Sequence, residues 1–469
     1  MTKTSNADVL DNLLAQSTSY VQWYERAQRY DQLSGREEWR HIDASDYYDY
    51  QQIKLRLDRL RTLRDAKDYQ ALLFTLNEGV HGNIGGIGHA KLYRYSKLGT
   101  KKLIENYISE VDTSLGLLAS LPSDIISTAK KRDFFNRASI CFGHSSLMLS
   151  GGGVLGYQHI GVVKALLSEG VLPNVISGSS AGSIFAGFLA CHDNAEITEL
   201  LHKENVVHGA GYTKRVGRLR VEDVAALIAQ WVPDLTFQEA FDKTGRKISV
   251  SIAPVDPHQG SRLLNAITSP NVSLRSGIMA SCAVPGIFPA VMLMAENAEG
   301  MRQPYLPSQR WVDGSFSDDL PAKRLSRLYG TNHSIVSMVN PIATPFLRAD
   351  SHNGNSLSRI AGGLGISLSR ELLGVSRSLA QKGGDKLTSL NAVLNSAHSV
   401  IDQNYLGDIN IVPSFKQLKL RKVLSHVSEQ ELLGLIQCGE QSTYPHIEAI
   451  RLCTQISRTL EAILDQLNR

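Results

Sequence analysis

Cysteine is scarce and scattered in this chain. Its 469 residues include only five cysteines, and no two of them are spaced as CxxC. This usage argues against a disulfide framework and against a structural zinc site, so we expect free thiols in a reducing compartment.

Long apolar runs are also missing. The most apolar window, residues 280–295, contains two prolines and is shorter than the roughly 20 residues of a membrane-spanning helix, so we expect any membrane contact to be peripheral.

A strong excess of one charge is lacking as well. The chain has 49 Lys and Arg against 45 Asp and Glu, a net charge of +4, which is too weak a bias to indicate a nucleic-acid partner. The amino-terminal residues lack the basic segment and apolar core of a secretory signal, so we expect no export by that route. With 42% hydrophobic and 20% charged residues the composition is that of a globular protein, and the length predicts roughly two or three domains.

The chain divides into three regions that differ in their sequence pattern. Residues 1–138 carry leucines at helical spacing among charged residues and predict a helical region. Residues 139–345 alternate short apolar runs, glycines and amphipathic segments, which is the pattern of βαβ units around a mostly parallel sheet. Residues 346–469 return to a helical pattern, with an apolar stripe over residues 428–467. That stripe predicts either core packing, the commoner use of an amphipathic helix, or docking on lipid.

The segment that carries the chemistry lies between residues 145 and 190. A short apolar strand leads into a glycine-rich loop and a helix, and the next strand, residues 175–177, ends in the sequence GSSAG before an apolar helix. Strand, sharp turn and helix around G-x-S-x-G form the context of a nucleophile elbow. Gly178 and Gly182 leave room on so sharp a turn. The pattern therefore predicts Ser180 as a nucleophile.

The glycine-rich loop itself allows two interpretations. Gly151 to Gly156 match G-x-G-x-x-G, but dinucleotide binding also requires an acidic residue at the end of the second strand, and that strand here ends in Ser-Gly-Ser-Ser. Alternatively, glycine N–H groups at the start of a helix can stabilise a developing negative charge, as an oxyanion hole requires. The second interpretation is favoured.

The base that would take the proton of Ser180 is less clearly marked. A Ser-His-Asp triad would need one of 14 histidines, none of which has distinguishing flanks, and it stays open. Asp313 follows an apolar strand and precedes Gly314, so it is the better-marked candidate, although an Asp-Gly pair is often a simple turn. An Asp has an ordinary pKa of about 3.9, so it can act as a base only if desolvation raises that pKa.

Taken together, these motifs resemble the patatin-like phospholipase family. The matching residues are GGGVLG followed by YQHIGVVKAL, then GSSAG, then an Asp-Gly pair 133 positions after the serine. The resemblance implies a three-layer α/β core with a central, mostly parallel sheet, flanked by helical regions at both ends of the chain. It also implies a Ser-Asp dyad, with Ser180 as nucleophile, Asp313 as base, and the amides of Gly151, Gly152 and Gly153 as the oxyanion hole.

Two departures from the family pattern point to one of its branches. Leu155 stands where many members carry Arg or Lys, and Ser315 stands where many carry Gly or Ala. Both departures are shared with the triacylglycerol lipases known from fungi and plants. Further similarity to that branch lies in residues 23–92, 281–289 and 403–409, so the resemblance extends over most of the chain.

The resemblance implies a lipid acyl hydrolase that cleaves carboxylic esters of glycerolipids through an acyl-enzyme. It implies no metal or organic cofactor. The expected partners are a glycerolipid or phospholipid substrate and a lipid surface, the oligomeric state stays open, and we expect a cytoplasmic protein that associates peripherally with membranes or lipid droplets. Apolar residues near the serine are candidates either for an acyl-chain wall or for ordinary core: Ile184, Phe185, Phe188, Leu189 and residues 284–291.

Two other functions could use the same fold. A non-catalytic lipid-binding scaffold would not need the glycines, the serine and the aspartate together, so the sequence favours an enzyme. An acyltransferase would use the same serine, with an alcohol in place of water. A separate acyltransferase pattern, His41 followed five positions later by Asp46, is expected about once by chance among so many histidines, and no glycine-rich or apolar site context surrounds it.

Overall fold

The described residues form two compact units that are each discontinuous in sequence. A computed structural model describes residues 6–202, 217–256, 258–341, 407–412 and 423–468. The helical unit consists of the described residues of 1–145, 329–333 and 443–469, and the sheet unit consists of those of 146–328 and 334–442. This division differs from the three consecutive regions predicted from the sequence, because the last helix packs with the amino-terminal helices. The predicted helical structure of residues 346–406 lies outside the described residues.

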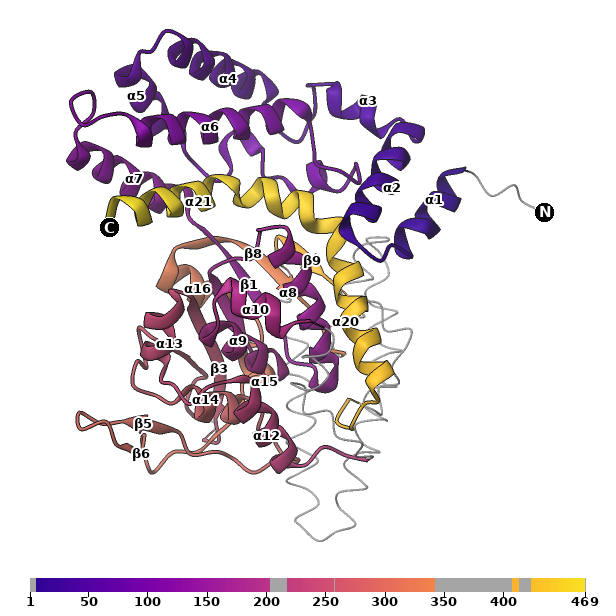
Figure 1. Ribbon diagram of the computed structural model, residues 1–469, viewed down its shortest axis with the longest axis vertical. Helices are drawn as coiled ribbons and strands as arrows, with labels where there is room; N and C mark the ends of the chain where they lie inside the picture. The colour runs from indigo at the N-terminus through magenta and orange to yellow at the C-terminus, as the bar shows by residue number, and fades with distance from the viewer. Residues whose placement is uncertain (1–5, 203–216, 257, 342–406, 413–422, 469) are drawn as a thin grey trace. The chain divides into compact units, whose positions relative to one another are not determined.

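The helical unit is built from α-helices (Figure 1), four of which begin with a side-chain cap. Side chains of Ser19, Asp49, Asp68 and Ser127 accept backbone N–H groups in the first turns of four of these helices, which satisfies donors that a helix start leaves unpaired. The helices of this unit are α1 (Asn6–Ala15), α2 (Tyr20–Leu33), α3 (Arg36–His41), α4 (Tyr50–Asp65), α5 (Tyr69–Gly79), α6 (Lys102–Ser120), α7 (Thr128–Phe142) and α21 (Ile447–Asn468).

The carboxy-terminal apolar stripe belongs to the core of this unit. Ile456, Leu460 and Ile463 of α21 join one buried cluster with residues of α4, α5, α6 and α7. Core packing, one of the two uses predicted for the stripe, is therefore confirmed for these residues. The predicted long helix is two helices, α20 (Glu429–Thr443) and α21, which are separated by a short turn containing Pro445, because proline removes a backbone donor that a continuous helix needs.

The sheet unit contains a seven-stranded, mostly parallel sheet, as the sequence predicts. Its strand order is β4-β3-β2-β1-β8-β9, and β7 pairs with β3. The β1–β2, β2–β3 and β8–β9 pairs are parallel, whereas β4 and β7 run antiparallel to β3. The strands are β1 (His144–Leu149), β2 (Val175–Gly178), β3 (Lys247–Pro254), β4 (Arg262–Asn265), β7 (Trp311–Asp313), β8 (Thr331–Ser337) and β9 (Ile409–Ile411).

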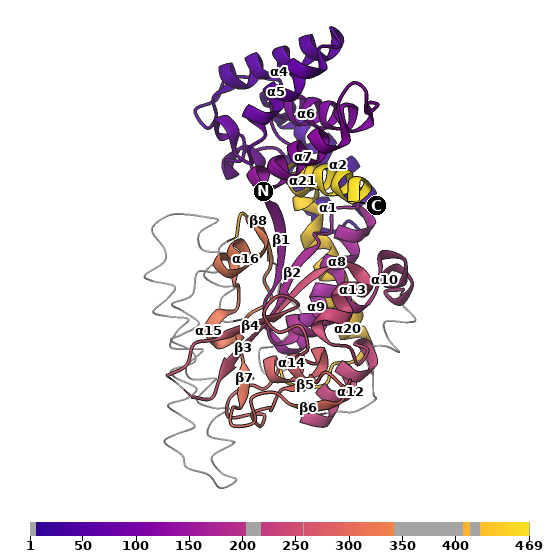
Figure 2. The same ribbon diagram turned by 90° about the vertical axis from the view of Figure 1, so that its left-hand side faces the viewer.

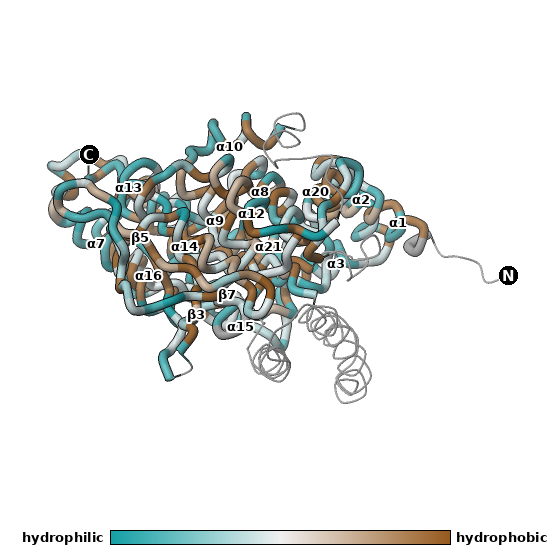
Figure 3. Tube along the Cα trace, turned by 90° about the horizontal axis from the view of Figure 1, so that it is seen from below, coloured by the Kyte–Doolittle hydropathy of each residue, from teal (hydrophilic) through white to brown (hydrophobic). Residues whose placement is uncertain are grey.

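Helices cover both faces of the central strands. Every residue of β2 and the inner six residues of β3 are buried, as expected of strands between two helical layers. Figure 2 shows α8 and α9 on one side of the strands and α16 on the other. Helix α9 is mostly apolar, with two glycines and one serine among its apolar residues (Figure 3), and all of its residues are buried. The helices of this unit are α8 (Gln158–Ser168), α9 (Ala181–Cys191), α10 (Asn194–Leu200), α12 (Val221–Trp231), α13 (Phe237–Thr244), α14 (Leu274–Ser281), α15 (Ser315–Asp318), α16 (Ala322–Tyr329) and α20.

A separate hairpin of β5 (Met294–Glu296) and β6 (Arg302–Pro304) precedes β7. Across the described ranges, no helix is both long and apolar enough to span a bilayer.

Candidate active site

Ser180 lies on the sharp turn between β2 and α9. Its backbone has φ 49° and ψ −125°, and it is one of three non-glycine residues with positive φ among those described. Such a backbone costs about 1–3 kcal/mol, so its surroundings must hold it. The amide of Ser180 donates to Ser281 Oγ at 2.9 Å. A Cβ atom on Gly178 would overlap backbone atoms at the start of α9, and one on Gly182 would overlap backbone atoms at the end of β1, so packing requires both predicted glycines.

Asp313 reaches this turn from the end of β7. Ile252 of β3 pairs with Arg262 of β4 on one edge and with Asp313 of β7 on the other. Strand β2 occupies that second edge only as far as Val250, which pairs with Gly178. Strand β7 therefore follows β2 along the same edge of β3, and this order places Asp313 beside the turn that begins after Gly178.

The Asp313 carboxylate is buried and strongly hydrogen-bonded. It is 1% exposed and accepts the Ser315 amide at 2.8 Å, and the side chains of Ser180 and Ser315 lie close enough to lower its pKa through hydrogen bonding. Burial raises the pKa of Asp313 to about 6, and the hydrogen bonds offset part of that rise. A carboxyl group with a pKa near neutrality can both accept and return a proton. The structure thus brings the predicted nucleophile and the predicted base into direct contact.

Histidine does not take the place of Asp313 beside the serine. Within the described ranges, no imidazole is hydrogen-bonded to the Ser180 side chain, whereas Ser180 is one of the groups that lower the pKa of Asp313. His159 is fully buried between the Ser150 carbonyl, at 2.9 Å, and Ser337 Oγ, at 2.7 Å. Burial lowers the pKa of His159 to about 4, so this imidazole stays neutral and holds the end of β1.

The glycine loop, residues 151–153, passes close to Ser180. Its three backbone amides differ in whether a protein group accepts their hydrogen bond. A Cβ atom on Gly151 would lie only 3.1 Å from Ser180 Cβ. The Gly151 amide donates to Asp319 Oδ1 at 2.8 Å, so it is not available to a substrate. The amides of Gly152 and Gly153 donate to no protein group within the described ranges. Of the three amides predicted for an oxyanion hole, Gly151 therefore already has a protein acceptor, and Gly152 and Gly153 have none among the described residues.

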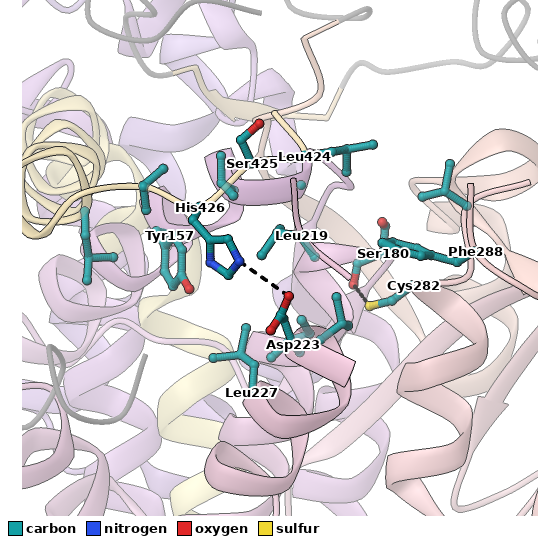
Figure 4. A pocket seen from close by; sticks show the side chains of 18 of the residues that line it. Tyr157, Ser180, Leu219, Asp223, Leu227, Cys282, Phe288, Leu424, Ser425 and His426 are labelled. Atoms are coloured by element: carbon teal, nitrogen blue, oxygen red, sulfur yellow. Dashed lines mark hydrogen bonds and ion pairs between the residues drawn. The ribbon is translucent and has the colours of Figure 1, made fainter. Parts of the chain in front are cut away.

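An apolar cavity that is partly open to solvent lies beside Ser180. Figure 4 shows Ser180 in the same part of the wall as Cys282 and Phe288. Of the apolar residues predicted as a wall, Ile184, Phe185, Val284 and Phe288 line the cavity, whereas Phe188 and Leu189 do not. Phe188 is core instead, because its ring packs against Trp231 at a centroid distance of 4.8 Å.

One polar pair in the cavity wall was not predicted. His426 Nε2 lies 3.4 Å from Asp223 Oδ2, and both side chains line the cavity (Figure 4). The amide of Arg220 also donates to this carboxylate at 2.9 Å. The two residues lie 203 positions apart in the sequence, so no local pattern could have paired them.

Three more residues around the serine carried no assigned role in the sequence. Ser281 accepts the Ser180 amide and donates to the Ser251 carbonyl at 2.8 Å. Cys282 donates its thiol to the Ser180 carbonyl at 3.4 Å, and burial raises the pKa of this thiol, which stays neutral. Asp319 holds Gly151. Family similarity singles out residues 281–289 but assigns no role to Ser281 or Cys282. Nothing in the sequence distinguishes Asp319 from the adjacent Asp318.

The chain belongs to the patatin-like phospholipase family, a family of carboxylic ester hydrolases. The family described as patatin-like phospholipase matches residues 147–325, and the domain of unknown function DUF3336 matches residues 1–139. Triacylglycerol lipase ptl3 of Schizosaccharomyces pombe is 31% identical over 455 residues, which cover 93% of this chain and 92% of that protein.

Other relatives are longer than this chain. Triacylglycerol lipase 4 of Saccharomyces cerevisiae is 32% identical over 466 residues, which cover 92% of this chain and 50% of that protein. A patatin-like phospholipase domain-containing protein of Coccidioides immitis is 33% identical over 97% of this chain and 66% of its own length. The chain thus spans about half the length of triacylglycerol lipase 4. The crystal structure of VipD from Legionella pneumophila covers 70% of this chain at 13% identity with a TM-score of 0.29, a likeness too slight to support any statement on the site.

Proposed function

We propose that this chain is a lipid acyl hydrolase that cleaves carboxylic esters of glycerolipids, with Ser180 as nucleophile and Asp313 as base. The observation that carries the proposal is the position of the Ser180 side chain next to the buried Asp313 carboxylate, whose pKa it lowers, beside an apolar cavity. Relatives named triacylglycerol lipase support a triacylglycerol as the substrate. Because such a substrate is insoluble, we propose that the protein meets it at a lipid surface and associates there peripherally.

The first half of the reaction forms an acyl-enzyme. Ser180 Oγ attacks the ester carbonyl carbon while its proton passes to Asp313, and the carbonyl oxygen becomes an oxyanion. The amides of Gly152 and Gly153 and the positive end of α9 stabilise that charge. When the tetrahedral intermediate collapses, the carbon–oxygen bond to the glycerol moiety breaks, and the proton on Asp313 passes to the leaving alkoxide.

The second half releases the fatty acid. Water attacks the acyl carbon and gives its proton to Asp313, and a second oxyanion forms at the same amides. Collapse breaks the bond to Ser180 Oγ, which regains the proton from Asp313. Proton and charge therefore balance over the cycle, with one water molecule consumed for each ester bond cleaved.

We expect a pH profile set by Asp313. A base must be deprotonated, and burial raises the pKa of this carboxyl to about 6. The value of kcat/KM should therefore be level above about pH 7 and fall tenfold per pH unit below about pH 6. Initial rates on a short-chain nitrophenyl ester between pH 4.5 and 9 measure this profile. A level rate down to pH 4.5 would contradict Asp313 as the base.

The cavity should set the acyl-chain preference. Leu227 lines the cavity from α12 and is half-buried, so Leu227→Trp should fill part of the volume. We expect release of oleate to fall about tenfold, while release of butyrate changes less than twofold, because a longer chain needs more of the cavity. Ala225→Trp, on an exposed position of the same helix, is the matched control. Equal effects on both chain lengths would contradict this assignment.

The decisive experiment is a substrate panel with a trapping reagent. Purified protein is assayed on triolein, phosphatidylcholine and lysophosphatidylcholine, and a fluorophosphonate is used to label the nucleophile, whose position is read by mass spectrometry. We expect release from at least triolein and labelling at Ser180. Release from none of the three lipids, with no labelling, would overturn the proposed function, and labelling at another residue would overturn the assignment of Ser180.

A further inference from the structure

A second buried carboxylate lies behind the glycine loop. Asp319 Oδ1 accepts the Gly151 amide at 2.8 Å, and Asp319 Oδ2 accepts the side-chain amide of Asn340 at 3.1 Å. Asp319 is 1% exposed, and the reaction steps above give it no role. Because a buried carboxylate is costly unless its oxygens are hydrogen-bonded, these contacts fix its position closely.

The residue before Gly151 is fixed from a different segment. Ser150 Oγ accepts the amides of Val339 and Asn340 at 2.8 and 3.2 Å. Asn340 thus contacts both Ser150 and Asp319. The start of the loop is therefore held at two successive residues by fully buried groups, and it has no freedom to shift independently of them.

The position of Gly151 decides where the next amides lie. Gly151 is the point at which the loop passes Ser180, and Gly153 lines the same cavity as Ser180. A peptide chain held at one amide has little freedom one residue later, since only two backbone dihedrals intervene. Donors in an oxyanion hole must lie about 2.7–3.1 Å from the oxygen they stabilise, so a small shift of Gly151 would misplace the two amides that follow.

We propose that Asp319 is a positioning residue of the oxyanion hole, which orients the amides of Gly152 and Gly153 toward the substrate carbonyl oxygen by holding the amide of Gly151. The inference rests on the proposed function, because it concerns the oxyanion of that same reaction. Asp319 acts through Gly151 and does not touch the reacting atoms.

A neutral amide should replace Asp319 with little loss. Burial, together with the charge on Asp313, raises the pKa of Asp319 to about 7 despite the hydrogen bonds that lower it, so a neutral group is compatible with this site near pH 7. In Asp319→Asn, the new carbonyl oxygen can accept the Gly151 amide, and the amide of Asn340 can rotate to present its oxygen. In Asp319→Leu, a side chain of similar size offers no acceptor, and the Gly151 amide loses its partner.

The test compares catalysis with the binding of an oxyanion mimic. A long-chain alkyl trifluoromethyl ketone adds to the nucleophilic serine and places an oxyanion in the hole. We expect Asp319→Leu to lower kcat about 10–100-fold with KM within twofold of the wild type, and to weaken inhibition by the ketone by the same factor. We expect Asp319→Asn to stay within about threefold of the wild type in both measurements.

Asp318 provides the matched control. It is the adjacent carboxylate, and it pairs with Arg324 at 3.2 Å instead of with the loop. Asp318→Leu should leave kcat and ketone inhibition within about threefold of the wild type. If thermal unfolding shows that Asp319→Leu does not fold, Asn340→Leu carries the test, because it removes the side-chain amide that donates to Asp319 Oδ2 and keeps the backbone amide that donates to Ser150 Oγ.

The outcomes separate this inference from the proposed function. A wild-type kcat in Asp319→Leu, or a lower kcat without a matching loss of ketone affinity, would overturn the positioning role; for Asn340→Leu the same two results decide. Hydrolysis that persists in Ser180→Ala would instead overturn the proposed function itself, whatever the Asp319 variants do.

Discussion

Ser180→Ala is expected to lower the hydrolysis of every ester substrate by about 10⁴-fold or more. Without the hydroxyl there is no nucleophile and no acyl-enzyme, and the remaining donors and binding groups give only residual catalysis. The measurement is fatty-acid release from triolein and from a short-chain ester, together with loss of fluorophosphonate labelling. Ser183→Ala is a suitable control, since Ser183 lies three residues further along α9 and donates to the Ser180 carbonyl.

The same position links activity to backbone strain. Ser180 holds a positive φ of 49°, which glycine adopts without a steric cost from Cβ. We therefore expect Ser180→Gly to be as inactive as Ser180→Ala but more stable than it by about 1 kcal/mol. Thermal unfolding of the two inactive variants measures this difference. Equal melting temperatures would show that the turn stores no strain, and hydrolysis in either variant would show that another group is the nucleophile.

Asp313→Asn is expected to lower kcat about 10³–10⁴-fold, with little change in substrate affinity. The amide keeps the size of the side chain and can still accept the Ser315 amide, but it cannot take the proton of Ser180. Asp256→Asn, an exposed aspartate just after β3, should keep wild-type activity. Activity above about a tenth of the wild type in Asp313→Asn would show that the base lies elsewhere.

The Asp313 variant should also change how stability depends on pH. The folded pKa of Asp313, about 6, lies above the ordinary value of about 3.9 in an unfolded chain. Between these values the folded protein binds more protons than the unfolded one, so this group lowers wild-type stability as pH rises from about 4 to 6. The melting temperature of Asp313→Asn minus that of the wild type should therefore increase over this range and stay level above it. A difference that does not vary with pH would contradict the raised pKa.

Local sequence patterns predicted the strand, turn and helix around Ser180 correctly. The apolar strand, the glycines at 178 and 182 and the apolar helix after them define a strand, a turn and a helix within fifteen or so residues, and each element depends on near neighbours. The same holds for the strand that ends at Asp313. Steric limits on small residues and the periodicity of apolar ones act over short distances, so they can be read without the rest of the chain.

The three-dimensional pairing of strands decided which side chains meet at the site. Asp313, Asp318 and Asp319 lie within seven residues of one another, and only the pairing of Asp313 with Ile252 directs that one carboxylate to Ser180. A strand shifted by one residue would turn its side chains to the opposite face, so neither the partner of Gly151 nor the pairing of Asp223 with His426 follows from spacing.

The sequence by itself thus determined which residue types and local turns the site contains. Tertiary structure alone decided which amide of the glycine loop is already occupied, which carboxylate faces the serine, and that the last helix belongs with the amino-terminal ones. The physical reason is that these outcomes depend on the register and packing of segments far apart in the chain, whose apolar patterns are each compatible with several partners.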